Sequence, residues 1–210
     1  MFGSLLALAF AAAVSGSHPA ALVGLYDGNQ MEMAAGLELK ADGRFRYGLA
    51  YGALDEEAEG TWRAEGDHVV LTSDPVTPPR ILFLGQQSAA PGTLRISLEA
   101  PHGLTPQLFV ATLGFAHSET TGEQLADDGL LRPIDPKDPP TSVRLSLPMF
   151  ELSGDPVAID PAKGYGLRFR FEPHDIGKVD FRANPLPIDK GDLLLDRHDR
   201  TIRFHRIKAP

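Results

Sequence analysis

Residues 37–47 of the chain read LELKADGRFRY, and this stretch decides the fold class. Apolar and polar residues alternate on both sides of Asp42-Gly43, and this period of two puts the apolar side chains, Phe45 and Tyr47 among them, on one face of two strands. An Asp-Gly pair between alternating runs is a strong hairpin signal. The stretch therefore predicts an antiparallel β-hairpin with one buried, partly aromatic face.

The same pattern continues outward from this hairpin. A second alternating pair follows, in which Gly60-Thr61-Trp62-Arg63 leads through a turn at residues 65–67 into Val69-Val70-Leu71-Thr72. Residues 196–200 separate two further apolar runs and indicate a terminal hairpin. The other strand-like segments of the C-terminal third are Val143–Leu147, Leu167–Phe171 and Thr201–Ile207. These patterns predict a predominantly β protein.

Residues 22–73 resemble the small lipocalin-like barrels of bacterial envelope proteins. The resemblance rests on the opening Gly24-Leu25-Tyr26, on the hairpin at 37–47, and on Gly60-x-Trp62 followed by Val70-Leu71. The copper-stress lipoproteins of the outer membrane carry an N-terminal domain of this type. The present chain has no cysteine, so it lacks both their lipid-attachment residue and their Cys-x-x-Cys pair. What the resemblance implies is therefore a barrel fold, without the metal or redox role of those proteins.

The chain has 210 residues, which allows more than one β module. We expect a signal peptide over residues 1–16, a lipocalin-like meander or barrel over residues 17–90, and a second, sandwich-like β domain over residues 91–210. The apolar run Leu5–Val14 ends in small residues and is too short to span a bilayer, as in secretory signals. A buried N-terminal helix is the alternative. The signal predicts export to the periplasm or the extracellular space, without a membrane span.

Composition excludes several function classes. The net charge of −8 argues against a nucleic-acid partner, which needs a clustered cationic face. The absence of cysteine excludes disulfides and thiolate nucleophiles. The sequence also lacks the Gly-x-Ser-x-Gly elbow, the His-Glu-x-x-His motif, the phosphate-binding glycine loop and the dinucleotide fingerprint. We therefore predict a protein that is not an enzyme and holds no cofactor.

The leading functional hypothesis concerns the inward-facing aromatic residues of the first module. Tyr26, Phe45, Tyr47 and Trp62 are expected to line one concave face, and ligand pockets are concave, apolar and aromatic. They predict an exported envelope protein that binds a small apolar ligand in its lipocalin-like half-barrel. The alternative is a structural or protein-interaction module with fully packed cores, which acts on another envelope protein through an exposed strand edge. An empty interior would favour the first hypothesis, and a solid core the second.

A third hypothesis is copper binding. Met31-Glu32-Met33 is expected to put two thioethers on the same side of a strand, where soft sulfur ligands suit Cu(I), although two methionines in a β core would show the same pattern. Cleavage after Ser15 would leave Gly16-Ser17-His18 as the N-terminus. Its amine, two amide nitrogens and the imidazole of His18 could form the square-planar site that Cu(II) prefers.

The charged clusters receive simpler interpretations. The carboxylate run at residues 55–59 is interpreted as a solvated hairpin loop rather than a calcium site, because no glycine lies within it. His174 and His198 lie near predicted turns and are expected at the surface. The arginines from Arg197 to Arg206, with Lys208, are interpreted as protection of an edge strand; the alternative is contact with an anionic partner or with the acidic first half of the chain.

Overall fold

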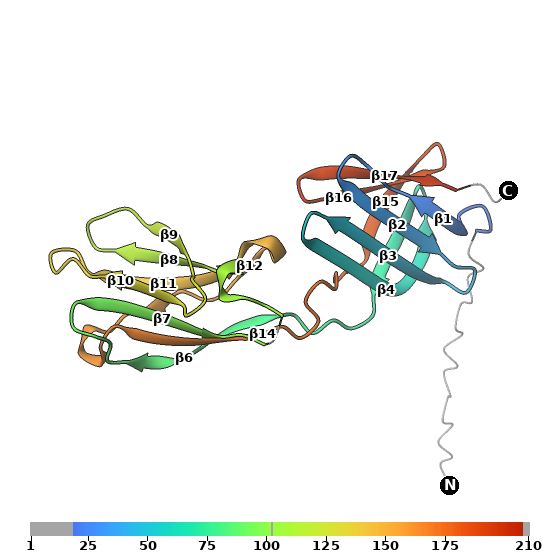
Figure 1. The fold of residues 1–210 in the computed structure, drawn as a ribbon. Helices are drawn as coiled ribbons and strands as arrows, with labels where there is room; N and C mark the ends of the chain where they lie inside the picture. Colours follow the sequence, from blue (N-terminus) through green and yellow to red (C-terminus); the bar gives the residue numbers. More distant parts are fainter. Residues whose placement is uncertain (1–18, 102, 208–210) are drawn as a thin grey trace, which may run out of the picture.

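The computed structural model describes residues 19–101 and 103–207, and these are built almost entirely of β-strands (Figure 1). Within these ranges the helical elements are three single 3-10 turns, η1 (Pro106–Leu108), η2 (Pro148–Phe150) and η3 (Pro161–Lys163). The predicted all-β class is confirmed. No helix in the described part of the chain is long and apolar enough to cross a membrane. The expected signal peptide and His18 lie outside the described residues.

Eight strands close into an antiparallel barrel, in which neighbours around the barrel are also neighbours along the chain. The order runs from β1 to β5, continues with β15 to β17, and returns to β1, so the barrel is an up-and-down meander with one interruption. This arrangement is compatible with the lipocalin-like resemblance. The strands are β1 (Gly24–Asp27), β2 (Met33–Leu39), β3 (Arg44–Tyr51), β4 (Leu54–Glu65), β5 (His68–Ser73), β15 (Asn184–Asp189), β16 (Asp192–Arg197) and β17 (Arg200–Arg206).

All three predicted hairpins, β2–β3, β4–β5 and β16–β17, are confirmed. In the first, Leu39 of β2 pairs with Phe45 of β3, and Gly43 takes a φ of 81° in the turn between them. In the terminal hairpin of β16 and β17, His198 and Asp199 both have positive φ, 52° and 56°. Two consecutive left-handed residues make the turn type whose twist matches that of the flanking strands.

The remaining strands form a sandwich of two sheets around one apolar core. One sheet has the order β10-β7-β14-β6, with β7 and β14 parallel; the other has the order β12-β11-β8-β9, with β13 beside β11. Leu94, Phe109, Leu145 and Phe169 are buried between the sheets. The strands are β6 (Arg80–Gln87), β7 (Thr93–Glu99), β8 (Val110–Phe115), β9 (Thr121–Gln124), β10 (Leu130–Pro133), β11 (Pro140–Leu147), β12 (Leu152–Ser153), β13 (Val157–Ala158) and β14 (Gly166–Glu172).

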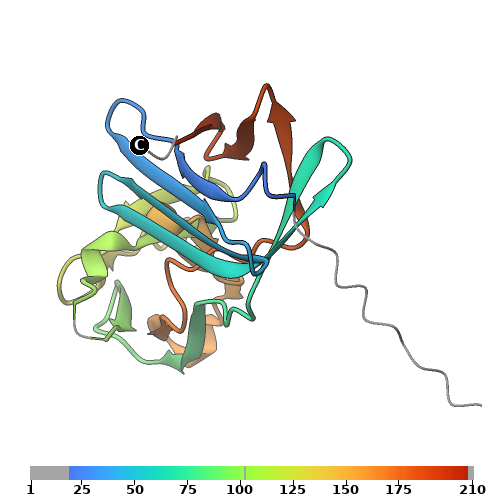
Figure 2. The ribbon, with the colours of Figure 1, turned by 90° about the vertical axis from the view of Figure 1, so that its right-hand side faces the viewer.

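The sandwich is inserted into the barrel between β5 and β15. In Figure 1 the two bodies lie side by side and are joined by two crossing segments, residues 74–79 outward and residues 173–183 in return; Figure 2 looks onto the barrel with the sandwich behind it. This differs from the expected division near residue 90. Residues 80–87 belong to the sandwich, and residues 184–206 belong to the barrel.

The barrel needs its C-terminal strands because β1 to β5 alone would leave two open edges. Tyr26 of β1 pairs with Arg206 of β17, and Leu186 of β15 pairs with Val69 of β5, so both edges are closed. A two-residue alternation tells which face of a strand is buried but not which strand lies beside it. The sequence pattern therefore predicted the hairpin of β16 and β17 but not its place beside β1, and it did not identify β15.

The return segment is hydrogen-bonded to the barrel beside β4, which extends well beyond the end of β5. The amide of Glu57 donates to the carbonyl of Gly177 at 2.9 Å, and the amide of Val179 donates to the carbonyl of Glu57 at 2.8 Å. The two crossing segments also bond each other, because the Thr77 amide donates to a carboxylate oxygen of Asp175 at 2.9 Å and the Asp175 amide donates to the carbonyl of Thr77 at 3.1 Å. Both connections are thus held close to the barrel.

Candidate functional site

The four aromatic residues of the ligand hypothesis lie together in the barrel core. Tyr26, Phe45, Tyr47 and Trp62 are exposed by only 2%, 1%, 4% and 2%. The polar atoms of two of them are satisfied by backbone carbonyls: the Tyr26 hydroxyl donates to Leu22 at 2.7 Å, and the Trp62 indole N–H donates to Lys40 at 2.9 Å. Burial raises the pKa of the Tyr26 phenol above its ordinary value.

A fifth aromatic side chain, which the sequence analysis missed, packs among them. Phe181 comes from the return segment rather than from a barrel strand, and its ring lies 5.3 Å from that of Tyr47 and 6.0 Å from that of Phe45, both edge-on. Phe204 of β17 contacts Tyr47 at 6.4 Å in the same manner. Side chains of the protein itself therefore fill the space between the predicted ligand residues.

The two methionines of the copper hypothesis are not brought together. Met31 lies in the turn before β2 and is 88% exposed, whereas Met33 begins β2 and is 6% exposed. Glu32 between them has a left-handed φ of 63°, which breaks the alternation on which the expectation rested. His18 lies outside the described residues. Within residues 19–101 and 103–207, no group of three or more His, Asp or Glu side chains is placed to hold a metal ion.

A buried carboxylate at the barrel mouth is the main feature that the sequence analysis missed. Residues 55–59 are part of β4 and not a solvated loop, so that interpretation was wrong. Alternate residues of β4 face the core, and Glu56 lies in the same row as Leu54, Ala58 and Trp62. Its side chain is only 7% exposed. A carboxylate in this position needs partners that compensate for its lost hydration.

Arg197, at the end of β16, is the principal partner of Glu56. Its Nε and Nη2 atoms donate to the two carboxylate oxygens, each at 2.6 Å, in a bidentate arrangement. The Tyr47 hydroxyl also points to Glu56, at 3.5 Å. Burial, reinforced by the charge of Glu56, raises the pKa of Tyr47 well above its ordinary value. Burial opposes the charge of Arg197, but its hydrogen bonds to Glu56 raise the pKa of the guanidinium overall.

His198 extends this network from the barrel to the sandwich. Its Nε2 atom lies 3.1 Å from Oε1 of Glu56, and its Nδ1 atom lies 3.3 Å from Oε1 of Glu151, the residue that ends η2 in the sandwich. The His198 side chain is 23% exposed, so the expectation of a simple surface role was wrong for this residue. His174 does lie near the surface, where it contacts Glu172 at 3.2 Å.

Apolar contacts surround this charged network. Met149 and Phe150 of η2 pack against the barrel core, and Phe150 also packs against the core of the sandwich. A small cavity of about 110 Å³ lies at the same place. Its lining residues come from barrel, sandwich and both crossing segments: Glu56, Pro79, Phe150, Glu151, Asp175, Ile176, Gly177, Lys178, Arg197 and His198. At this junction, charged side chains from the barrel and the sandwich meet around one cavity.

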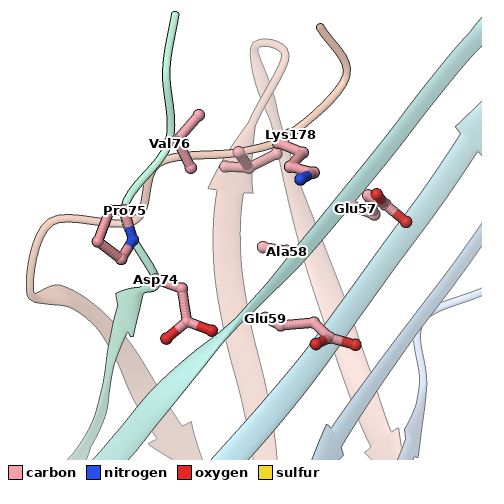
Figure 3. A pocket seen from close by; sticks show the side chains of 8 residues that line it. Glu57, Ala58, Glu59, Asp74, Pro75, Val76 and Lys178 are labelled. Atoms are coloured by element: carbon pink, nitrogen blue, oxygen red, sulfur yellow. The ribbon is translucent and has the colours of Figure 1, made fainter. Parts of the chain in front are cut away.

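A second, larger cleft of about 330 Å³ opens beside the junction (Figure 3). It lies between β4 and the crossing segments, and Figure 3 shows the carboxylates of Glu59 and Asp74 with the ammonium group of Lys178 at its wall. Asp74 is paired with Arg44, and this hydrogen bond lowers the pKa of its carboxyl. Glu59 is paired with Arg46 at 3.0 Å, so both acidic groups are engaged with cations of the chain itself.

The arginines of the predicted basic stripe are likewise paired within the chain. Arg203 binds Asp189 at 2.8 Å and Asp192 at 3.2 Å, and the guanidinium of Arg200 lies 5.1 Å from the centre of the Tyr51 ring. Of these arginines, all within the described residues, Arg197 alone pairs with a carboxylate of the acidic first half of the chain, Glu56, so the alternative interpretation holds for this one residue. Its interpretation as edge protection was wrong, because β17 lies between β16 and β1.

No family model, curated protein or solved structure matches this chain. The arrangement of the junction must therefore be interpreted from its own chemistry. Arg197 binds both oxygens of the Glu56 carboxylate, and a carboxylate fixed in this way can position the groups around it.

Proposed function

We propose that the protein is an exported, non-enzymatic interaction protein, in which a packed barrel carries a β-sandwich that binds an extended segment of a partner protein. The observation that carries this proposal is the unpaired edge of β6, which presents apolar side chains to solvent. An interaction module with packed cores was the alternative hypothesis from the sequence, and the β6 edge adds where such a module would bind. The packed interior around Phe181 supports it over a small apolar ligand.

The exposed side of β6 has the properties of a strand-addition site. β6 is the last strand of its sheet and pairs only with β14 among the described strands. Phe83 and Leu84 are 40% and 36% exposed, and Phe83 lies against the buried ring of Phe169 at 5.3 Å. Long apolar edge strands are normally blunted because their free N–H and C=O groups recruit other strands. Here the edge is unpaired and apolar, with a bulge at Leu84 where the register with β14 shifts.

The geometry of the edge defines its occupant. The end of β6 is occupied, because the side-chain Nε2 of Gln86 donates to the carbonyl of Asp160 at 2.7 Å and its side-chain Oε1 accepts from the backbone N–H of Asp160 at 3.2 Å. Residues 80–85 remain, which span about 20 Å in extended form. An extended peptide satisfies such an edge by main-chain hydrogen bonds. Arg80 is exposed and has no ion pair among the described residues, so an acidic residue in the peptide would complement it.

The test is selection of peptides from a displayed library of about ten-residue extended sequences against the purified protein. Recovered peptides should carry an apolar residue near an acidic one and should protect the amides of β6 from hydrogen exchange. Leu84→Lys should weaken their binding by about tenfold or more, because it places a charge against the apolar strand. The matched control is Leu131→Lys, at a 60% exposed leucine on β10, the opposite edge strand of the same sheet. The proposal fails if no peptide is recovered, or if binding survives Leu84→Lys.

A further inference from the structure

His198 contacts both bodies of the protein, and neither contact involves β6. We infer that Glu56, His198 and Glu151 form a pH-sensitive latch that holds the sandwich against the barrel when the imidazole is protonated. Glu56 belongs to the barrel, Glu151 belongs to the sandwich, and the imidazole lies between them with one ring nitrogen facing each carboxylate. The inference does not depend on what β6 binds.

The donor count of the imidazole is the first argument. A neutral imidazole carries one N–H and one acceptor nitrogen, whereas the protonated ring donates from both nitrogens. Both contacts of His198 are to carboxylate oxygens, which can only accept, so both can be hydrogen bonds only when the ring is protonated. After loss of one proton, a nitrogen lone pair would face one of the carboxylates. The two contacts then compete.

The surrounding charges determine which contact is lost. Glu56 keeps its two bonds from Arg197 whatever the state of His198, and Asp175 is paired with Lys178 at 2.9 Å. Glu151, which is 74% exposed, has His198 as its one ion-pair partner among the described residues. The Tyr47 hydroxyl faces Glu56, Arg197 attracts Glu151 electrostatically, and Asp199 lies in the same turn as His198. Neutral His198 therefore donates to buried Glu56 and releases Glu151, since water can take its place there.

The position of Glu151 converts this release into a change between the two bodies. Glu151 follows directly on Met149 and Phe150, the residues through which η2 packs against the barrel core. Its φ of 51° is left-handed, so the backbone turns sharply at the contact. Besides this contact, the bodies are connected by the crossing segments. Loss of the His198–Glu151 tie therefore lets η2 leave the barrel more often, and imidazole titrates between about pH 5 and pH 8.

The test measures the distance between barrel and sandwich in the intact protein. Because the chain has no cysteine, Met31→Cys and Leu131→Cys supply one spin label on each body at exposed positions. Distance distributions from pulsed electron paramagnetic resonance are compared at about pH 5.5 and about pH 8.5, on either side of the imidazole range. We expect the ratio of docked to undocked molecules to fall about fivefold or more at the higher pH.

Two variants separate the latch from general effects of pH. His198→Asn keeps a residue that tolerates the left-handed turn, so it should fold as the parent does, and it should show the undocked ratio at both pH values. Glu151→Gln should stay docked at both, because a glutamine N–H can donate to the neutral ring. His205→Gln, at a histidine of the same hairpin that binds Asp192, should keep the parental response. An unchanged distribution in the parent, or a response that survives His198→Asn, would overturn the inference.

Discussion

Glu56 and Arg197 are 141 positions apart in the chain, and they meet in a bidentate ion pair across the mouth of the barrel. Their strands, β4 and β16, are not neighbours in the sheet, since β5 and β15 lie between them. The pair therefore links the part of the barrel that precedes the insertion to the part that follows it. The stability of the barrel should therefore depend on this pair.

Removal of one member of the pair should be more damaging than removal of both. Arg197→Ala leaves the largely buried carboxylate of Glu56 without its bidentate partner. We expect a loss of roughly 2 to 3 kcal/mol in the free energy of unfolding, less than for a fully buried pair because Arg197 is partly exposed. The double variant Glu56→Gln/Arg197→Ala should recover part of this loss. Urea denaturation at neutral pH measures both. Equal losses in the single and the double variant would show that the unpaired carboxylate of Glu56 is not the cause of the destabilisation.

Gly60 should tolerate no side chain at all. A Cβ atom at this position would lie 2.0 Å from the carbonyl oxygen of Thr72 and 2.8 Å from the ring of Phe45. Gly60→Ala should therefore cost on the order of 1 to 3 kcal/mol, the range for overpacked cores, and shift the thermal midpoint downward. Gly36→Ala is the control, because a Cβ atom there meets nothing within 4 Å. Equal thermal midpoints of the two variants would show that β4 and β5 leave room for a side chain at Gly60.

Truncation of Phe181 should open the barrel that its ring fills. Phe181→Ala should cost about 3 to 5 kcal/mol, as other large aromatic truncations do, and should leave an apolar cavity beside Tyr47. We expect a small fluorescent apolar probe to bind the variant and to leave the parent protein unbound, with Trp62 emission as the signal. Saturable binding to the parent at micromolar concentration would instead return the apolar-ligand hypothesis to first place.

The junction between the crossing segments should weaken in acid. The backbone N–H of Thr77 and the side chain of Lys178 lower the pKa of Asp175 below its ordinary value of 3.8. A carboxyl whose pKa is lower in the folded state stabilises the fold above its unfolded pKa, and this contribution is lost as the pH falls through the folded value. The fall in unfolding free energy between about pH 6 and pH 2.5 should be smaller in Asp175→Asn than in the parent. Asp180→Asn, in the same segment and paired with Arg182, is the control.

Export can be tested by weighing the product. If the apolar run Leu5–Val14 is a secretory signal, the mature protein made from the full gene should begin between Gly16 and His18. Intact mass spectrometry of the exported fraction identifies the first residue. A soluble product that retains residues 1–15 would contradict the expectation of export.

The buried face of the barrel strands and the partners within each hairpin were predictable, but the pairing of strands far apart in the chain was not. Alternation placed Phe45, Tyr47 and Trp62 inside, and all three are buried. It could not show that β17 returns to β1, because strand pairing joins residues at opposite ends of the chain. The insertion of the sandwich followed from that pairing and was missed for the same reason.

The alternation of buried and exposed residues in β4 was missed at Glu56 because this residue lies within a run of acidic residues. Its neighbours Asp55 and Glu57 are exposed, and the whole run was interpreted as solvated. Extending the alternation of Gly60-x-Trp62 backward by two steps, however, assigns Ala58 and Glu56 to the buried row. That signal was present in the sequence. The second half of the network, His198 and Glu151, depends on how two bodies meet, and no local pattern reports it.

The position of the insertion also determines which of the two bodies can be completed first during synthesis. The sandwich strands occupy one continuous stretch, so a nascent chain holds all of them once Glu172 has emerged. The barrel lacks three of its eight strands at that moment. The edge of β5 stays open until β15 is made, and the edge of β1 stays open until β17 is made. Domains generally fold as units during synthesis, and open strand edges are prone to aggregation. The last strands made thus complete the module that begins first, and a chain truncated after the sandwich keeps a barrel that cannot close.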